Sequence, residues 1–362
     1  MRGGLILAVE SSCDETGIAL VEDGRKIHSN VVASQVAMHA AAGGIVPEVA
    51  ARAHLRWIVP VLDEAWDSAG VGWDDVSAVA VTEGPGLAGS LLVGINFAKT
   101  LAYVHDKPLV PVNHLEGHLY AAWLEDAARE IEEPVFPLVA LIVSGGHTFL
   151  VEMRDHLTYR LLGETIDDAA GEAFDKVGRL LGLPYPGGPA IMKAAAGSKR
   201  HDVVFPRAWL GETFDFSFSG LKTAARRVIG AERGAAALPA IPSNGVTATA
   251  EERPLPADRV AELAYGFQDS VVDVLVTKTL RAARRAGARS VVLGGGVAAN
   301  RVLRDRLADG AREAGIPLVV PRPALCTDNG AMIGAAAARR WEAGARAGLD
   351  LDARPSLPLA RR

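Results

Sequence analysis

The chain has 362 residues, 49% of them hydrophobic, which is enough apolar material to fill two cores and excludes a disordered chain. No apolar stretch reaches the length of a membrane span, and the first residues lead into a strand pattern, so we expect neither a membrane segment nor a signal peptide. The formal net charge of −5 gives no general sign of nucleic-acid binding, although a local basic patch could still hold an RNA backbone.

Two apolar segments near the start, 5–9 and 17–21, flank a short polar turn and predict a pair of strands. The same pattern returns at 138–143 and 149–153, around the turn 144–148. The chain is therefore expected to contain a duplicated half, and each copy of the turn is a place where chemistry can lie.

Each half also contains an apolar strand that enters a glycine turn, at 76–81 and at 290–293. Helical patterns separate the strands and cover 47–66, 89–103, 169–181, 259–286, 298–314 and 328–343. This alternation of strands and helices predicts the α/β class. The stretch 230–257 is rich in Ala, Pro, Gly and Thr without a period, so it is expected to be a flexible insert.

His114 and His118 lie four residues apart in a segment that continues as helix, so both imidazoles would project from one face and suit a divalent metal. Two half-buried histidines without a metal explain the spacing about equally well. A metalloprotease needs a glutamate directly after the first histidine, where Leu115 stands. Asp328 is the best third ligand, with a helix N-cap as its alternative role.

The turn 10–16 concentrates three carboxylates, including Asp14 and Glu15, which a metal, a cationic group or proton transfer would explain. A solvated acidic hairpin is the alternative. Cys13 lies in the same turn, but no histidine is near it in sequence, and a small apolar role is commoner than a nucleophile. Because Cys13 and Cys326 are too few for a disulfide framework, we expect a reducing, cytoplasmic location.

The turn at Ser144, Gly145 and Gly146 and the glycines 294–296 offer backbone N–H groups without obstruction by side chains, as a phosphate or nucleotide requires. Ordinary turn geometry explains either glycine turn taken alone.

Ten segments, in order along the chain, resemble the motifs of the TsaD family, the tRNA adenosine threonylcarbamoyltransferases. They are 10–16 (ESSCDET), 44–48 (GIVPE), 84–87 (GPGL), 114–118 (HLEGH), 143–148 (VSGGHT), 167–176 (DDAAGEAFDK), 185–189 (YPGGP), 216–222 (FSFSGLK), 295–300 (GGVAAN) and 326–330 (CTDNG). The resemblance covers nearly the whole chain.

The resemblance implies a two-lobed actin-like (ASKHA) fold, with duplicated RNase H-like halves and an interlobe cleft. On this fold the lobes are expected at 1–112 and 113–327, with the helix 328–345 packing back on the first lobe and a tail at 346–362. It also implies one divalent metal per subunit, Fe²⁺ or else Zn²⁺, held by His114, His118 and Asp328. The substrate positions it implies are Ile142, Val143, Ser144, Gly145, Gly146, Asp175, Gly188 and Asn300.

The implied reaction moves the threonylcarbamoyl group from threonylcarbamoyl-AMP to the exocyclic amine of the adenosine next to the anticodon, in tRNAs that read codons beginning with A. AMP is released. Asp14 or Glu15 is our hypothesis for the group that takes the amine proton. The implied partners are tRNA, an inactive paralogue and an ATPase.

Two other functions are weighed against this one. A phosphotransferase is possible on an actin-like fold, but such kinases hold Mg²⁺ through carboxylates and the nucleotide, without a histidine pair. A non-catalytic scaffold would be expected to lose the metal and glycine motifs, which are all present here.

Overall fold

The computed structural model describes residues 4–40, 44–125, 133–233 and 254–360. The strands of the first lobe are β1 (Leu5–Glu10), β2 (Glu15–Glu22), β3 (Lys26–Ser34), β4 (Val76–Gly84) and β5 (Leu109–Asn113). Those of the second lobe are β6 (Leu138–Val143), β7 (Thr148–Asp155), β8 (Thr158–Glu164), β9 (Ser290–Gly294) and β10 (Leu318–Val319). The α/β class is confirmed.

The two sheets have the same topology. The first has the strand order β3-β2-β1-β4-β5 and the second the order β8-β7-β6-β9-β10. In each sheet the first three strands of the lobe run antiparallel to their neighbours, and the last two join in parallel. The duplication predicted from the repeated sequence pattern is therefore confirmed.

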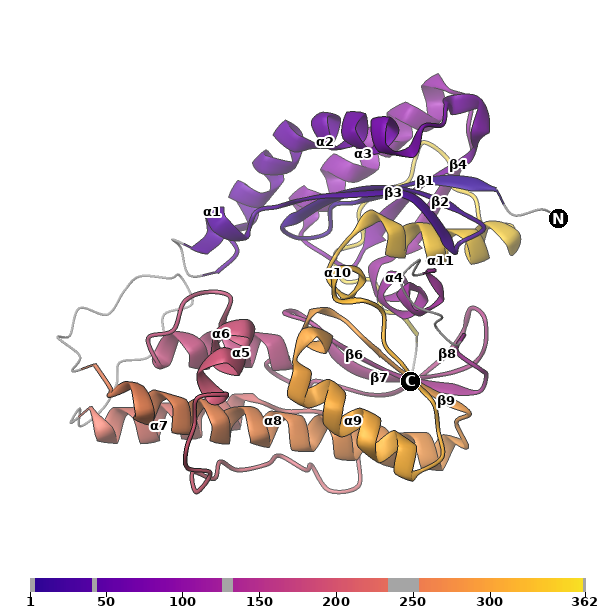
Figure 1. Cartoon of the computed structure of the whole chain (residues 1–362). Helices are drawn as coiled ribbons and strands as arrows, with labels where there is room; N and C mark the ends of the chain where they lie inside the picture. Colours follow the sequence, from indigo (N-terminus) through magenta and orange to yellow (C-terminus); the bar gives the residue numbers. More distant parts are fainter. Residues whose placement is uncertain (1–3, 41–43, 126–132, 234–253, 361–362) are drawn as a thin grey trace.

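Helices and sheets alternate in five layers (Figure 1). Helices α2 and α3 cover the outer face of the first sheet, α4 and α11 lie between the sheets, and α5 to α9 cover the outer face of the second sheet. The helices are α1 (Val36–Ala40), α2 (Pro47–Ala69), α3 (Ala88–Val104), α4 (His114–Tyr120), α5 (Ala170–Leu180), α6 (Gly187–Ala195), α7 (Ser219–Glu232), α8 (Ala257–Ala286), α9 (Arg301–Glu313), α10 (Pro323–Cys326) and α11 (Gly330–Glu342). None of these helices is long and apolar enough to cross a membrane.

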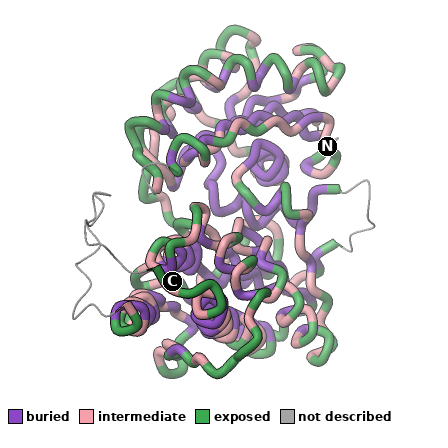
Figure 2. The backbone as a smooth tube through the Cα atoms, turned by 60° about the vertical axis from the view of Figure 1, so that its left-hand side comes forward, coloured by how far each residue is buried: buried purple, intermediate pink, exposed green. Residues whose placement is uncertain are grey.

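Strands β1 and β6 are buried on both faces, which explains their unbroken apolar sequences. In β1, Ile6 and Ala8 face the central layer and Leu7 and Val9 face the outer helices, as the twofold period of a strand requires. Between the sheets, α11 buries every residue from 330 to 338. Figure 2 shows buried residues gathered along the middle of the molecule and exposed residues over its outer helices.

The predicted insert 230–257 begins too early, because 230–232 are the last residues of α7 and its apolar face continues through Ile229 into the core. Residues 234–253 of that insert lie outside the described residues. The terminal helix is also shorter than expected, since Asn329 caps it at the start and it ends at Glu342.

The segment after α11, residues 344–360, runs back along the first lobe. It forms a bridge to the first residue of β5, and the Arg354 amide donates to the Glu83 carbonyl at the end of β4 over 2.8 Å. The Asn113 side chain then donates to the Pro358 carbonyl over 3.1 Å. The segment thus crosses the carboxyl ends of β4 and β5 and contacts the residue directly before His114.

Candidate metal centre and substrate site

The two histidines predicted to bind a metal lie on α4, directly after β5. The Asn113 side chain accepts a hydrogen bond from the Leu115 amide over 2.8 Å, and this cap starts the helix at His114. His114 and His118 are therefore one helical turn apart, and their side chains are 5% and 0% exposed.

Asp328 approaches both histidines from the start of α11. Its Oδ1 lies 3.6 Å from His114 Nε2 and 3.2 Å from His118 Nε2, and the three candidate ligand atoms lie within 4.8 Å of one another. The alternative role of Asp328 as a helix cap is wrong, because Asn329 supplies the cap through its bond from the Met332 amide.

The chemistry of this group fits a divalent cation. Among the described residues, neither ring nitrogen of buried His118 has a hydrogen-bond partner of good geometry, and a buried polar atom left in this state is costly. Two imidazoles and one carboxylate form a ligand set typical of catalytic zinc and of non-haem iron, with positions left open for substrate. The structure therefore supports a possible metal site here.

Glu10 orients His114 from behind, and the sequence reasoning missed this role. Its Oε2 lies 3.1 Å from His114 Nδ1 and accepts a 2.6 Å bond from the Thr82 hydroxyl. Burial acts to lower the pKa of His114, but the carboxylates of Asp328 and Glu10 outweigh it and raise the pKa to about 9. A carboxylate behind a ligating histidine fixes its ring and directs Nε2 at the metal.

The rest of the acidic turn lies beside this centre, and the solvated hairpin is wrong for it, because Glu10 and Asp14 are 0% and 7% exposed. Helix α2 holds the turn through His54, whose ring nitrogens contact Thr16 Oγ1 at 2.7 Å and the Cys13 carbonyl at 3.0 Å. Burial, then Asp14, raises the pKa of Cys13 and so disfavours its thiolate form.

Burial raises the pKa of Glu15 to about 10, helped by Asp328 and Asp14. In the metal-free chain Glu15 is therefore a neutral acid at pH 7. A neutral carboxyl group is a poor proton acceptor, and the Glu15 side chain accepts a hydrogen bond from the Ser34 hydroxyl over 3.2 Å.

The turn after β6 is open to a ligand. Its Ser144 amide donates to the His147 carbonyl over 2.8 Å, and a side chain at Gly145 or Gly146 would meet nothing within 4 Å. The amino end of α5 abuts this turn, since the Gly171 amide donates to the Ser144 carbonyl over 3.2 Å. A glycine turn beside a helix N-terminus is a favourable environment for a phosphate.

Ile142 and Val143 are fully buried in β6, so only their backbone could meet a ligand. Asp175, on α5, accepts a 2.7 Å bond from the Gly187 amide at the start of α6, next to Gly188. Burial raises the pKa of Asp175 to about 6, although the Gly187 amide opposes the change.

Asn300 is largely occupied within the protein. Its side-chain oxygen accepts from the Leu303 amide and caps α9, and its amide donates to Gln268 Oε1 over 2.9 Å. The neighbouring glycines also have a structural reason, because Gly295 has φ +84° and a Cβ there would lie 2.4 Å from the Val143 carbonyl oxygen. Ordinary turn packing thus accounts for Gly295.

The candidate metal ligands and the glycine turn lie close together. The ring of His147, in the turn, lies 6.2 Å from the ring of His114, and burial lowers the pKa of His147 to about 4. Burial, and then the carboxylates of Asp175 and Asp14, raise the pKa of Tyr185. The sequence reasoning included His147 and Tyr185 in the segments 143–148 and 185–189 but assigned neither of them a role of its own.

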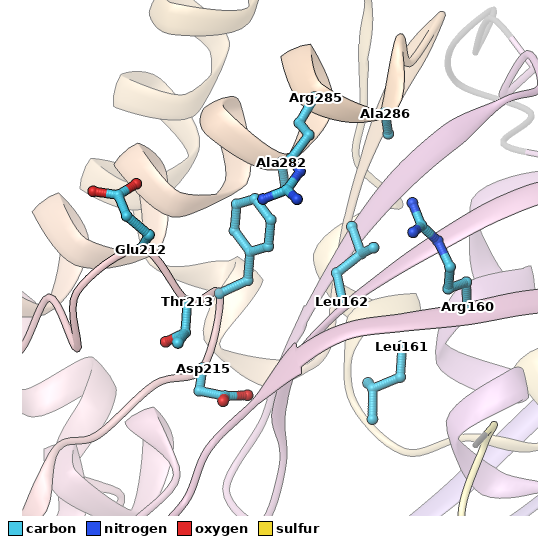
Figure 3. Close-up of a pocket in the computed structure, with 10 residues that line it drawn as sticks. Arg160, Leu161, Leu162, Glu212, Thr213, Asp215, Ala282, Arg285 and Ala286 are labelled. Atoms are coloured by element: carbon cyan, nitrogen blue, oxygen red, sulfur yellow. The ribbon is translucent and has the colours of Figure 1, made fainter. Parts of the chain in front are cut away.

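A cavity of about 340 Å³ lies elsewhere, between β8, the segment 212–215 and the end of α8 (Figure 3). The β8 residues that line this cavity pair with β7, and the β7 residues opposite them pair with the first half of β6. The glycine turn follows the other end of β6, so the cavity and the turn lie apart. Arg160 in its wall donates to Glu152 over 2.8 Å, and the Arg285 guanidinium lies 5.8 Å from the Phe214 ring. This cavity contains no predicted site residue.

Comparisons with known proteins agree with this architecture. The family model TsaD, tRNA N6-adenosine threonylcarbamoyltransferase, matches residues 26–335. A relative of that name from Thermomicrobium roseum is 56% identical over 99% of this chain and 98% of its own length. Another from Bacillus subtilis is 48% identical over 98% of this chain and 95% of its own length.

Among solved structures, full-length HypF in the phosphate- and nucleotide-bound form matches with a TM-score of 0.56 and 13% identity, over 94% of this chain and 46% of that one. HypF from T. kodakarensis gives 0.55 and 14%, over 94% and 48%. These likenesses concern the fold alone, which is the two-lobed actin-like fold that was predicted. From the family match and the full-length relatives together, we conclude that the chain belongs to the TsaD family, the tRNA N6-adenosine threonylcarbamoyltransferases.

Proposed function

We propose that this chain transfers the threonylcarbamoyl group from threonylcarbamoyl-AMP to the exocyclic amine of the adenosine next to the anticodon, in tRNAs reading codons that begin with A, with release of AMP. Full-length similarity to threonylcarbamoyltransferases carries this proposal. The group of His114, His118 and Asp328, beside an open glycine turn, supplies a site of suitable chemistry.

His114, His118 and Asp328 would hold one divalent ion, Fe²⁺ in preference to Zn²⁺. When bound, such an ion polarises an oxygen of the substrate and so stabilises negative charge that develops there. Glu10 keeps the ring of His114 in place during this reaction.

The phosphate of threonylcarbamoyl-AMP would lie against the backbone of Ser144, Gly145 and Gly146, where the amino end of α5 adds favourable potential. Ile142, Val143, Gly188 and Asn300 complete the proposed substrate positions through backbone or shape. The Asp175 carboxylate on α5, which contacts the start of α6, is suited to accept a hydrogen bond from a ribose hydroxyl.

Proton removal from the adenosine amine needs an ionised carboxylate near the crevice. Of the two predicted candidates, Glu15 fits this task less well, because its pKa is raised to about 10 in the metal-free chain. Glu15 then orients Asp14 or the substrate by donating a hydrogen bond.

The test is transfer of labelled threonine from threonylcarbamoyl-AMP to unmodified tRNA, with partner proteins supplied. His118→Ala and Asp328→Ala should lose both bound metal and transfer, whereas His28→Ala, which removes an imidazole paired with Glu22, should keep both. Transfer that survives in both site variants would remove the metal from the mechanism. No transfer by the wild type would contradict the proposed function.

The same assay separates the two carboxylates. Asp14→Asn should reduce the transfer rate by a factor of about 10² to 10⁴, the contribution usual for a general base. Glu15→Gln keeps a hydrogen-bond donor and should reduce it much less. Equal rates for both variants and the wild type would exclude a proton-transfer role for this turn.

We also propose that the chain works in the cytoplasm with an inactive paralogue and an ATPase. Exposed apolar side chains on α2 and α3 support a partner surface in the first lobe, because Leu55, Val59 and Leu92 are 66%, 52% and 40% exposed. Leu55→Glu with Val59→Glu should abolish co-purification of the paralogue and leave metal binding intact. Undiminished co-purification would place the partner on another surface.

A further inference from the structure

Glu116 lies between the two metal-ligating histidines in sequence but on the opposite face of α4, since two residues along a helix turn it by about 200°. Its side chain is 5% exposed, and its Oε2 accepts a 2.7 Å bond from the Arg340 guanidinium on α11. The Arg340 side chain is 24% exposed, so Glu116 is the buried member of the pair, and nothing in the reaction proposed above uses it.

The pair connects the two elements that supply the metal ligands. Helix α4 carries both histidines, and α11 begins two residues after Asp328. The helices touch at Gly117, where a Cβ would lie 2.8 Å from Ile333 Cδ1. A small displacement of one helix along the other would therefore change the separation of the histidines from the aspartate.

Close packing at Gly117 holds α4 against α11, and the Glu116–Arg340 pair adds a directional polar contact between the same two helices. Replacing a buried ion pair by apolar residues is often neutral or stabilising, so its best attested use is to specify register. The hydroxyl of Tyr159, on β8, is also buried near Glu116 and has no hydrogen-bond partner of good geometry among the described residues.

We propose that Glu116 is a positioning residue whose ion pair with Arg340 sets the register of α4 against α11, and thereby the spacing of His114 and His118 from Asp328. This inference rests on the metal role in the proposed function. It predicts that metal affinity depends on two side chains that do not contact the metal.

The experiment is a double-mutant cycle on the full chain, with Glu116→Gln, Arg340→Met and both together. Affinity for Zn²⁺ is measured by calorimetry, and folding by circular dichroism and melting temperature. Each single variant should bind Zn²⁺ about 10- to 100-fold more weakly, the range usual for residues that support metal ligands. The double variant should be no weaker than the weaker single, because both changes remove the same interaction.

Arg339→Met is the matched control, because it removes a 3.1 Å pair that lies within α11, with Glu342, and leaves the Glu116–Arg340 pair in place. Its affinity for Zn²⁺ should equal that of the wild type. Arg340→Lys, which keeps the charge, should recover part of the affinity lost in Arg340→Met.

Unchanged Zn²⁺ affinity in Glu116→Gln, with or without a fall in melting temperature, would overturn the inference, as would additive losses in the double variant. Failure of the metal role itself is distinguishable. In that case wild type and His118→Ala bind Zn²⁺ equally, and both the metal proposal and this inference are overturned.

Discussion

Metal binding to this chain should depend strongly on pH, because the metal must compete with a proton for His114. In the metal-free chain this imidazole lies between Glu10 and Asp328, whose carboxylates raise its pKa to about 9. Metals bind the neutral ring, so binding at pH 7 must release that proton. One displaced proton makes the apparent affinity rise about tenfold per pH unit below pH 9.

Between pH 6 and pH 8 the expected change is therefore about 100-fold, equivalent to about 2.7 kcal/mol, and the dependence should flatten above about pH 9. Calorimetry with Zn²⁺ in two buffers of different ionisation enthalpy counts the protons released, and at least about one is expected at pH 7. Glu10→Gln removes one of the two carboxylates and should release a smaller fraction of a proton. Constant affinity from pH 6 to pH 8, without proton release, would refute the reasoning.

Three further outcomes are expected. The pKa of His114 is raised on folding, so its stabilising effect on the metal-free chain is fully present below about pH 6.5 and is lost as pH rises through about 9. The melting temperature measured in chelator should therefore fall over that pH range. His114→Gln should make this fall smaller. Metal at 100 times its dissociation constant should stabilise the chain by about 2.7 kcal/mol, which raises the melting temperature of a 362-residue chain by about 3 to 4 °C. A rise of the same size in Asp328→Asn would mean that the metal binds elsewhere. In urea unfolding, Gly330→Ala should destabilise the protein by about 1 to 3 kcal/mol, because a Cβ there would lie 2.6 Å from the Ala19 amide nitrogen. Gly220→Ala, in open space on α7, should stabilise the protein by about 0.5 to 1 kcal/mol. Equal effects of the two substitutions would contradict the packing argument.

Local patterns in the sequence were sufficient for the central strands and the long helices. Strands β1 and β6 are buried on both faces and so leave continuous apolar runs, which are easily recognised. Strands β3 and β5 were missed because β3 is half exposed and polar at its start, and β5 has only five residues with Pro111 among them. Edge and short strands depend on neighbours that the local sequence does not contain.

Some residues of the candidate site could likewise be recognised from local sequence, and others could not. The spacing of His114 and His118 could be read locally, but Asp328 is far away in sequence, and only the family resemblance selected it over a capping role. Glu10 could not be recognised as buried, because its burial depends on Thr82 and His114, which arrive from later strands. The predicted substrate and catalytic residues stay predictions.

The return of the chain's last segments to the first lobe has a consequence for the order in which the protein becomes functional during synthesis. Strands β1 to β5 are made first, yet the inner face of their sheet is covered by α11, and the cap of α4 is contacted by Pro358. A nascent chain that has not yet reached these residues exposes Ile6 and Ala8 and lacks Asp328. The three candidate ligands can therefore come together only after α11 has begun to be made, long after the sheet that it covers.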